Sequence, residues 1–286
     1  MILLYHLCSS RCGCAIIQGM EYIFETKEYS LARTLQCGQC FRFAQQPDGS
    51  FSGVANGCLL QLWQQGDTVT VRCDAPLPDM SWLGSYFALT DCCDDAFSAM
   101  RQDDMLAEML RLCGGIRIMR QPFWEVLCSF IISQNNNIPR ISAIVERLCT
   151  LFGEERNGCF AFPSPERIAQ LSAEDLAPLR CGYRAPYIID AAQKLASGEV
   201  TEQTVRSLPL EEARKELLKI KGVGPKVADC VLLFGAGHTD AFPQDVWIKR
   251  AMAQYFPNGL PACAAPYAGL AQQYIFHYAR TEGHFE

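Results

Sequence analysis

The sequence has no run of about eighteen apolar residues, the length that a helical membrane span requires. A helical membrane protein is therefore excluded. Internal repeats and low-complexity tracts are also missing. A disulfide framework is not indicated, because the 16 cysteines are scattered through helix and strand patterns, as buried reduced thiols of a cytosolic protein are. Cys37 and Cys40 have the spacing of half a zinc site, but no second pair accompanies them, so no metal site is predicted.

Residues 1–19 have no clear structural pattern. Their apolar part is short, and no positive cluster precedes it, so they lack the features of a secretion signal. A plausible strand begins at Met20. We expect residues 1–19 to be a tail or a misassigned start.

The sequence also lacks an excess of positive charge, since its formal net charge is −6. The acids are concentrated, however: residues 74–110 hold eight acids and one base, whereas residues 206–250 hold eight bases and six acids. The acidic segment is most simply a solvated face. A site that binds phosphate through backbone N–H groups needs fewer basic side chains, so the charge does not exclude a nucleic-acid partner.

The pattern changes from strands to helices along the chain. Between Met20 and about Cys73, short strand-like runs alternate with turn signals, among them Pro47-Asp48-Gly49-Ser50. Beyond Pro78 the pattern is helical, beginning with one expected helix over 91–112. Strands followed by helices predict an α+β fold. We expect an antiparallel sheet domain over 20–113 and a helical domain over 114–286.

The most informative segment is 207–250, within which Lys221-Gly222-Val223-Gly224-Pro225-Lys226 predicts a tight turn between two helices. Gly222 and Gly224 end the first helix, and Pro225 suits the first turn of the second. Such a turn leaves backbone N–H groups free to bind phosphate. Nineteen residues after Lys226, Asp245 stands where another helix should begin. An amine and a carboxylate in one cleft provide a nucleophile and its electrostatic partner.

This segment resembles the helix-hairpin-helix and Gly/Pro…Asp motif of a DNA glycosylase superfamily. Together with Ser133-Gln134-Asn135-Asn136-Asn137, the run Lys226-Val227-Ala228-Asp229-Cys230 resembles the 8-oxoguanine DNA glycosylase/AP lyases. The resemblance covers nearly everything from about Met20 onward. It implies a small antiparallel sheet domain and two helical subdomains with the active-site cleft between them. Iron–sulfur members carry four cysteines after the aspartate-bearing helix, and this chain has Cys263 alone there, which disfavours that branch.

The resemblance assigns the chemistry to Lys226 and Asp245. Lys226 would attack the sugar C1′, expel the damaged base and form a Schiff base that permits β-elimination. An apolar environment favours this role, because it disfavours the ammonium form of a lysine. Asp245 would stabilise positive charge on the sugar and also cap a helix. This chemistry needs no cofactor and no metal.

Four residues are expected to bind the extruded base. The carbonyl of Gly38 would accept the N7–H that distinguishes 8-oxoguanine from guanine. Cys230 lies four residues after Lys226 and would pack on one face of the base, and Phe276 would pack on the other. Gln272 would bond the Watson–Crick edge. Without the resemblance, Gln272 and Phe276 would be interpreted as core residues of an amphipathic helix, and Gly38 as a turn or bulge glycine.

The remaining predicted contacts are with the DNA duplex. Asn135 would fill the gap left by the flipped nucleotide, and Tyr183 would wedge into the stack. Arg140 and Arg184 would read the orphaned cytosine. The hairpin glycines and the residue two beyond the aspartate complete the set: Gly222, Gly224 and Trp247. In relatives a histidine often stands at this last position, so the tryptophan puts that contact in doubt.

The sequence therefore predicts a monomeric glycosylase/lyase that excises 8-oxoguanine opposite cytosine from double-stranded DNA in base excision repair. It is expected in the cytoplasm, associated with the nucleoid through DNA and not with a membrane. Two alternatives stay open. One is a glycosylase of the same superfamily for other damaged purines, which Lys226 disfavours. The other is a non-catalytic DNA-binding module that uses the hairpin as a phosphate clamp.

Overall fold

The structure is a computed structural model that describes residues 3–5, 15–18, 21–73 and 81–283. The chain divides into two compact units. Unit 1 comprises Met1–Gly53, Leu59–Arg120 and Gln244–Glu286, and unit 2 comprises Val54–Cys58 and Gln121–Pro243. Within the described residues, no helix is both long and apolar enough to cross a membrane.

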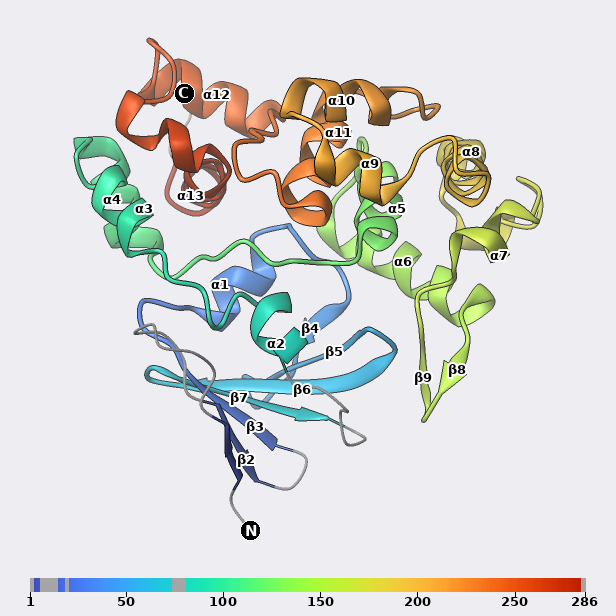
Figure 1. The fold of residues 1–286 in the computed structure, drawn as a ribbon, viewed down its shortest axis with the longest axis horizontal. Helices are drawn as coiled ribbons and strands as arrows, with labels where there is room; N and C mark the ends of the chain where they lie inside the picture. The colour runs from blue at the N-terminus through green and yellow to red at the C-terminus, as the bar shows by residue number, and fades with distance from the viewer. Residues whose placement is uncertain (1–2, 6–14, 19–20, 74–80, 284–286) are drawn as a thin grey trace. The chain divides into compact units, whose positions relative to one another are not determined.

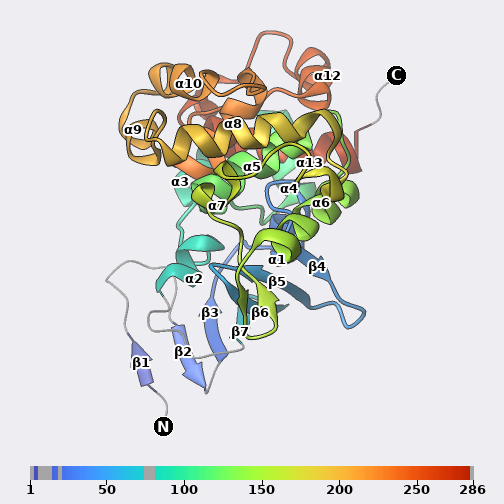
Figure 2. The same ribbon diagram turned by 90° about the vertical axis from the view of Figure 1, so that its right-hand side faces the viewer.

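The described strands of the N-terminal region form one antiparallel sheet in the order β1-β2-β3-β7-β6-β5-β4 (Figures 1 and 2). Their bounds are β1 Leu3–Tyr5, β2 Ala15–Gln18, β3 Glu21–Glu25, β4 Phe43–Gln45, β5 Phe51–Ala55, β6 Cys58–Gln65 and β7 Thr68–Cys73. On β3, Phe24 pairs with Val69 of β7, and both side chains are buried. Alternating residues of β3, β5 and β7 are buried, as expected for strands with one face on a core.

The helices of unit 1 come from both ends of the chain (Figure 1). They are α1 Leu31–Gln36, α2 Ser81–Tyr86, α3 Asp94–Met100, α4 Asp104–Cys113, α12 Val246–Tyr255, η4 Ala262–Tyr267 and α13 Ala268–Thr281. Helix α13 packs against α4 and α12. Its fully buried Tyr274 accepts hydrogen bonds at the hydroxyl from the backbone N–H groups of Gly115 and Ile116, both at 3.1 Å. These contacts tie the C-terminal helix to the segment after α4.

Unit 2 is built around α5 (Phe123–Ser133), which is buried along almost its whole length and contacts α6, α8, α11 and η3. The other elements are α6 Ile138–Phe152, β8 Glu155–Arg156, β9 Cys159–Phe160, α7 Pro165–Ala169, η1 Ala177–Leu179, η2 Gly182–Arg184, α8 Ala185–Ala196, α9 Glu202–Ser207, α10 Leu210–Leu218, α11 Pro225–Val231 and the π-helical turn η3 Leu232–Ala236. An apolar helix of this kind is typical of the centre of a helical core.

The predicted α+β class is confirmed, because an antiparallel sheet precedes a mostly helical region. Two local expectations were wrong. The helix expected over 91–112 is two helices, since Asp103 caps α4 by accepting from Leu106 N at 3.0 Å. The run Cys40-Phe41-Arg42-Phe43, one of the strand-like runs after Met20, forms a strand only from Phe43, and the short helix α1, capped by Ser30, precedes it.

Within residues 1–19, β1 and β2 pair antiparallel, and β2 pairs with β3. The compact units divide the chain after Arg120 and again after Pro243. Packing of α13 on α4 joins the end of the chain to the sheet-containing unit, a relation that sequence order cannot reveal.

Candidate active site

The predicted hairpin is present in unit 2, between α10 and α11. Gly222 has a φ of 80°, and an added Cβ there would collide with the ring of Tyr187 on α8. A glycine is therefore required at this turn for two reasons, the backbone conformation and the space. Gly224 is the N-cap of α11 and Pro225 is its first residue. Lys221 N donates to Asp190 Oδ2 at 2.7 Å, which fastens the hairpin to α8.

Lys226 is the second residue of α11 and is half-buried. Its Nζ lies 5.0 Å from the ring centroid of Phe130 on α5, which stacks on Phe234 at 5.4 Å. Within unit 2, as far as the structure describes it, no carboxylate pairs with this amine. An aromatic face attracts an ammonium less strongly than a carboxylate does and cannot take its proton. The environment therefore orients the amine without fixing it in an ion pair.

Two residues that the sequence analysis missed connect the helices on either side of the hairpin. Arg214 Nε on α10 donates to Asp229 Oδ1 on α11 at 2.7 Å. Burial raises the pKa of the Asp229 carboxyl above its ordinary value, and the Arg214 guanidinium opposes this rise. Asp229 lies three residues after Lys226, so this ion pair fixes the helix that carries the amine. Cys230 follows it and is 3% exposed.

The asparagine run forms a turn that joins α5 to α6. Asn137 is the N-cap of α6 and accepts from Arg140 N at 3.0 Å. Asn135 has a left-handed backbone with a φ of 46°, and its side chain is exposed. The side chain of Arg140 is exposed as well. The turn therefore presents Asn135 and Arg140 to solvent, while its third asparagine is used for capping.

Tyr183 and Arg184 lie in a second turn, η2, and differ greatly in exposure. Tyr183 is 53% exposed, whereas Arg184 is 3% exposed and donates to backbone carbonyls of the asparagine turn. The structure thus brings together two turns that both carry residues predicted to contact the duplex. Arg184, however, is not presented to solvent as Asn135, Arg140 and Tyr183 are.

Asp245, predicted as a helix cap and catalytic group, belongs to unit 1. Its Oδ1 accepts from Ile248 N at 2.8 Å, which confirms its position as the N-cap of α12. Val246 and Trp247 follow it on the first turn and are 63% and 40% exposed. This first turn is therefore an exposed, partly apolar surface next to a half-buried carboxylate.

Gly38 also lies in unit 1, in the turn after α1 and not in a strand. Its φ is 83°, a conformation that favours glycine. The next residue, Gln39, is fully buried and was not singled out from the sequence. Its side-chain amide donates to the carbonyls of Thr34 and Arg117 and accepts from Met119 N, at 2.8–2.9 Å. These bonds hold the backbone around Gly38 in a fixed position.

Cys37, the first of the two cysteines that flank this turn, is a neutral thiol. Burial raises its pKa to about 12, and its Sγ donates to Thr34 O at 3.3 Å. The described cysteines, Cys37 and Cys40 included, are free thiols. A buried protonated thiol of this kind packs as a small apolar side chain.

The two predicted residues of α13 also lie in unit 1. Gln272 is 3% exposed, and its Oε1 accepts from Gln273 Nε2 at 2.8 Å. Phe276, one turn later, is half-buried, and the guanidinium of Arg280 lies 5.3 Å from its ring centroid. Gly38, Gln272 and Phe276 thus belong to unit 1, whereas Lys226 and Cys230 belong to unit 2.

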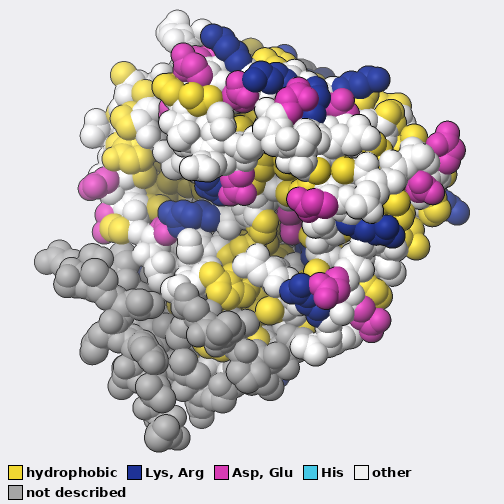
Figure 3. All heavy atoms as spheres, turned by 45° about the vertical axis from the view of Figure 1, so that its right-hand side comes forward, with side chains coloured by type: hydrophobic (Ala, Val, Ile, Leu, Met, Phe, Trp, Pro, Cys, Tyr) yellow, Lys and Arg dark blue, Asp and Glu magenta, His cyan; other side chains and the backbone are white. Residues whose placement is uncertain are grey.

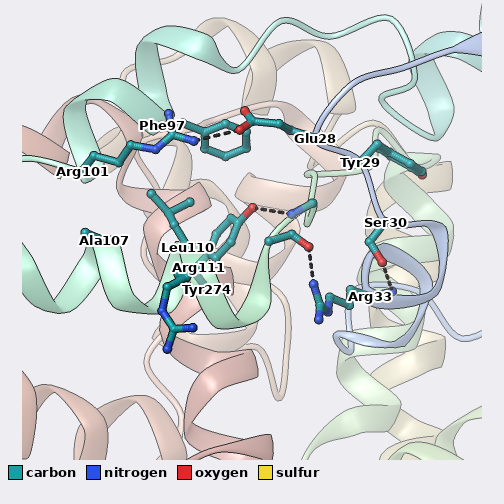
Figure 4. Close-up of a pocket in the computed structure, with 12 residues that line it drawn as sticks. Glu28, Tyr29, Ser30, Arg33, Phe97, Arg101, Ala107, Leu110, Arg111 and Tyr274 are labelled. Atoms are coloured by element: carbon teal, nitrogen blue, oxygen red, sulfur yellow. Dashed lines mark hydrogen bonds and ion pairs between the residues drawn. The ribbon is translucent and has the colours of Figure 1, made fainter. Parts of the chain in front are cut away.

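A cavity of about 610 Å³ in unit 1 is separate from these residues (Figure 4). It is lined by side chains of α1, α3, α4 and α13, among them Arg33, Phe97 and Tyr274. None of the predicted base-binding residues lines it. Figure 4 shows the hydroxyl of Tyr274 bonded to the backbone beside it, so this cavity marks the place where α13 is anchored.

Charge on the surface is mixed. In Figure 3, Lys and Arg side chains alternate with Asp and Glu side chains and form no continuous basic patch on the face shown. Several surface charges of the protein are paired, for example Lys219 with Glu216 at 2.7 Å. Phosphate binding on such a face depends on backbone N–H groups and individual side chains.

Comparison with known proteins agrees with this geometry. The model of the HhH-GPD superfamily base excision DNA repair proteins matches residues 128–259, which include the hairpin and Asp245. The model of the 8-oxoguanine DNA glycosylase N-terminal domain matches residues 21–127. The hairpin and these matches define the class as a base excision DNA glycosylase of the HhH-GPD superfamily.

Individual relatives identify the family within this superfamily. The N-glycosylase/DNA lyase OGG1 of Arabidopsis thaliana is 30% identical over 276 residues, which cover 90% of this chain and 75% of the relative. A solved structure of MBOgg1 in complex with a low affinity DNA ligand has a TM-score of 0.88 at 37% identity, covering 95% of this chain and 99% of that one. The 8-oxoguanine glycosylase/lyase of Clostridium acetobutylicum, in complex with double-stranded DNA containing cytosine opposite 8-oxoguanine, has a TM-score of 0.85 at 29% identity and covers 99% of each chain. The chain belongs to the 8-oxoguanine DNA glycosylase/AP lyase family.

Proposed function

We propose that this chain excises 8-oxoguanine opposite cytosine from duplex DNA and then cleaves the strand, with Lys226 as the nucleophile. The glycosylase and lyase activities follow from the family. The assignment to Lys226 depends on its position directly after the hairpin, at the start of α11 and over the face of Phe130. At this position the hairpin fixes the backbone of Lys226. Among the described residues of unit 2, no carboxylate forms an ion pair with its amine.

The reaction begins when the neutral amine of Lys226 attacks C1′ of the damaged nucleotide. The bond between C1′ and N9 breaks, and the base leaves with the electron pair and takes up a proton. Loss of the amine proton and opening of the sugar ring then give a Schiff base between Nζ and C1′. Removal of a proton from C2′ expels the 3′ phosphate by β-elimination, and water later hydrolyses the Schiff base.

Other residues supply charge and recognition in this proposal. Asp245, the N-cap of α12, stabilises the positive charge that develops on the sugar. The carbonyl of Gly38 accepts the N7–H of 8-oxoguanine, whereas guanine would present a lone pair there. Gln272 bonds the Watson–Crick edge, and Cys230 and Phe276 contact the two faces of the base.

Residues of the two turns and the hairpin contact the duplex. Asn135 occupies the space of the extruded nucleotide, and Tyr183 supports the kink. Gly222 and Gly224 bring the hairpin backbone close to phosphate, and Trp247 adds an exposed contact on α12. We further propose that the protein acts as a monomer on the DNA of the cytoplasm.

Reduction by borohydride tests the proposal, because it converts a Schiff base into a stable covalent adduct. Wild-type protein, Lys226→Gln and Lys215→Gln are mixed with an 8-oxoguanine:cytosine duplex and borohydride. Lys215 is an exposed lysine on α10 and serves as the matched control. Adduct in the wild type and in Lys215→Gln, with none in Lys226→Gln, is expected. Adduct in all three would assign the nucleophile elsewhere, and tight binding without adduct in any would favour a binding module.

A further inference from the structure

Gln273, the residue after Gln272 on α13, is buried and donates a hydrogen bond to it. Both side chains are 3% exposed. Nε2 of Gln273 donates to Oε1 of Gln272 at 2.8 Å. An amide nitrogen donates and an amide oxygen accepts, so this bond defines which end of the Gln272 carboxamide is the oxygen. Gln273 therefore selects one of the two orientations that the Gln272 amide can take.

The helix that carries this pair is itself held in place. Residues Ala268–Ile275 of α13 are all buried. The hydroxyl of Tyr274 accepts hydrogen bonds from two backbone N–H groups after α4, which fixes the rotation of α13 about its axis (Figure 4). Gln272 and Phe276 are one helical turn apart and share a face of the helix. With the backbone fixed, the orientation of the Gln272 amide is set by the side chains around it.

Gln273 is an unfavourable residue for the stability of this helix. Among the residues that the structure describes, its buried Oε1 has no hydrogen-bond partner. Such an oxygen costs free energy, and an apolar side chain of similar size would avoid this cost. Rotation of both amides together would keep the bond between them but would place two donors where the oxygen now lies. The bond to Gln272 explains a glutamine at this position better than packing does.

We propose that Gln273 is a positioning residue that holds the Gln272 amide in the orientation that matches a 6-oxopurine and not a 6-aminopurine. This rests on the proposed function, in which Gln272 bonds the Watson–Crick edge. 8-Oxoguanine has an acceptor at O6 and a donor at N1–H, whereas 8-oxoadenine has a donor at its 6-amino group and an acceptor at N1. Opposite orientations of a carboxamide match these two patterns. To bind 8-oxoadenine, Gln272 must turn and lose its bond to Gln273.

Three damaged bases isolate the contribution of this edge. 8-Oxoadenine has the same O8 and N7–H as 8-oxoguanine, so the proposed contact with the carbonyl of Gly38 is unchanged. The two bases differ only on the edge that Gln272 would bond. 8-Oxohypoxanthine has the O6 and N1–H of 8-oxoguanine but lacks its 2-amino group. Its excision therefore shows whether the pattern at O6 and N1 or the 2-amino group carries the discrimination.

The test measures single-turnover excision of these three bases, each opposite cytosine, by the wild type, Gln273→Met and Gln273→Leu. Both substitutions remove the donor and keep a buried side chain. Excision of 8-oxoadenine should rise about tenfold, because the Gln272 amide can turn without breaking a buried hydrogen bond. Excision of 8-oxoguanine should fall by less than about threefold, since the matching orientation stays accessible. 8-Oxohypoxanthine should follow 8-oxoguanine in every protein.

Tyr274→Phe is the matched control, because the adjacent Tyr274 is also buried and its hydroxyl anchors α13. This substitution should lower the midpoint of thermal unfolding by about 3 °C and leave the ratio of 8-oxoadenine to 8-oxoguanine excision unchanged. The Gln273 variants should have a midpoint equal to or above that of the wild type. A role in packing alone would give the opposite result, with a lower midpoint, slower excision of all three bases and an unchanged ratio.

The outcomes decide the role, because general damage to the fold does not increase the excision of one base. An unchanged ratio in both Gln273 variants would overturn the proposal, as would an equal increase in Tyr274→Phe. Failure of both Gln273 variants to fold would also overturn it, since the residue would then be needed for stability. The same holds if 8-oxohypoxanthine follows 8-oxoadenine. Absence of 8-oxoguanine excision by the wild type would instead contradict the proposed function.

Discussion

Arg214 and Asp229 form an ion pair, with Nε and Oδ1 2.7 Å apart. The pair joins the two helices of the hairpin, and Asp229 lies about one helical turn after Lys226, the residue that we propose as nucleophile. Arg214 also pairs with Glu211 on its own helix. The side chains of Arg214 and Asp229 are 20% and 12% exposed. Both charges are largely buried, and each is stabilised by the other. Removal of one partner should therefore lower the free energy of unfolding more than replacement of both by neutral residues.

Arg214→Ala should lower the free energy of unfolding by about 3 kcal/mol at neutral pH, because it leaves a buried carboxylate without its partner. The loss should shrink in acid, when Asp229 is protonated. Burial already raises the pKa of Asp229 in the folded protein, so its ionisation costs stability as pH rises above the ordinary carboxyl range. Urea unfolding at pH 7.5 and at pH 4.5 measures both effects.

The matched variant is Arg214→Ala combined with Asp229→Asn. The double variant leaves neither charge of the ion pair behind, so it should be more stable than Arg214→Ala alone at pH 7.5. Its destabilisation relative to the wild type should be the same at pH 7.5 and pH 4.5. An equal loss at both pH values in Arg214→Ala would show that packing, and not charge, explains the destabilisation.

The two hairpin glycines should respond differently to alanine. Gly222→Ala introduces both a left-handed backbone and a collision with the Tyr187 ring, and should lower the free energy of unfolding by about 2 kcal/mol. Gly224 has a φ of −100° and no atom within 4 Å of an added Cβ, so Gly224→Ala should change stability by less than about 0.5 kcal/mol. Thermal unfolding compares them, and equal destabilisation would contradict the assigned turn geometry.

Gln39 should control discrimination without touching DNA. Gln39→Leu removes the bonds that hold the turn of Gly38 and should reduce the ratio of 8-oxoguanine to guanine excision by about tenfold. Trapping on abasic DNA should be nearly unchanged. Gln64→Leu is the control, since Gln64 bridges Leu31 N and Tyr29 O at the other end of α1. A similar loss of discrimination in both variants would mean that general loosening of unit 1 is responsible.

Local signals predicted much of this protein. The turn glycines, Pro225 and the capping aspartate gave the helix-hairpin-helix and the start of α12, because caps and tight turns are encoded within a few residues. The short helix α1 was missed because its six residues carry too little periodicity. The single helix expected over 91–112 was wrong for a related reason: a capping residue inside a helical pattern is easily overlooked.

Long-range partners could not be predicted in the same way. Arg184 reaches Gln134 across fifty residues, and Gln39 reaches Arg117 across seventy-eight. In the sequence, Asp229 is not distinguishable from other polar residues of an amphipathic helix. Its role is recognised only from the position of Arg214 on α10. A sequence indicates which residues carry chemistry, but the side chains that hold them are recognised only when the tertiary contacts are known.

Asp245 combines a cap with the proposed catalytic charge, and two substitutions separate these roles. Asparagine is as good an N-cap as aspartate, so Asp245→Asn should keep stability within about 0.5 kcal/mol. The loss of charge should nevertheless slow base excision by about a hundredfold, because the carboxylate no longer stabilises the positive charge on the sugar. Asp245→Ala should lose the bond to Ile248 N as well and cost about 1 kcal/mol of stability. If Asp245→Asn excises the base at the wild-type rate in single-turnover assays, the carboxylate is a helix cap and has no part in the reaction.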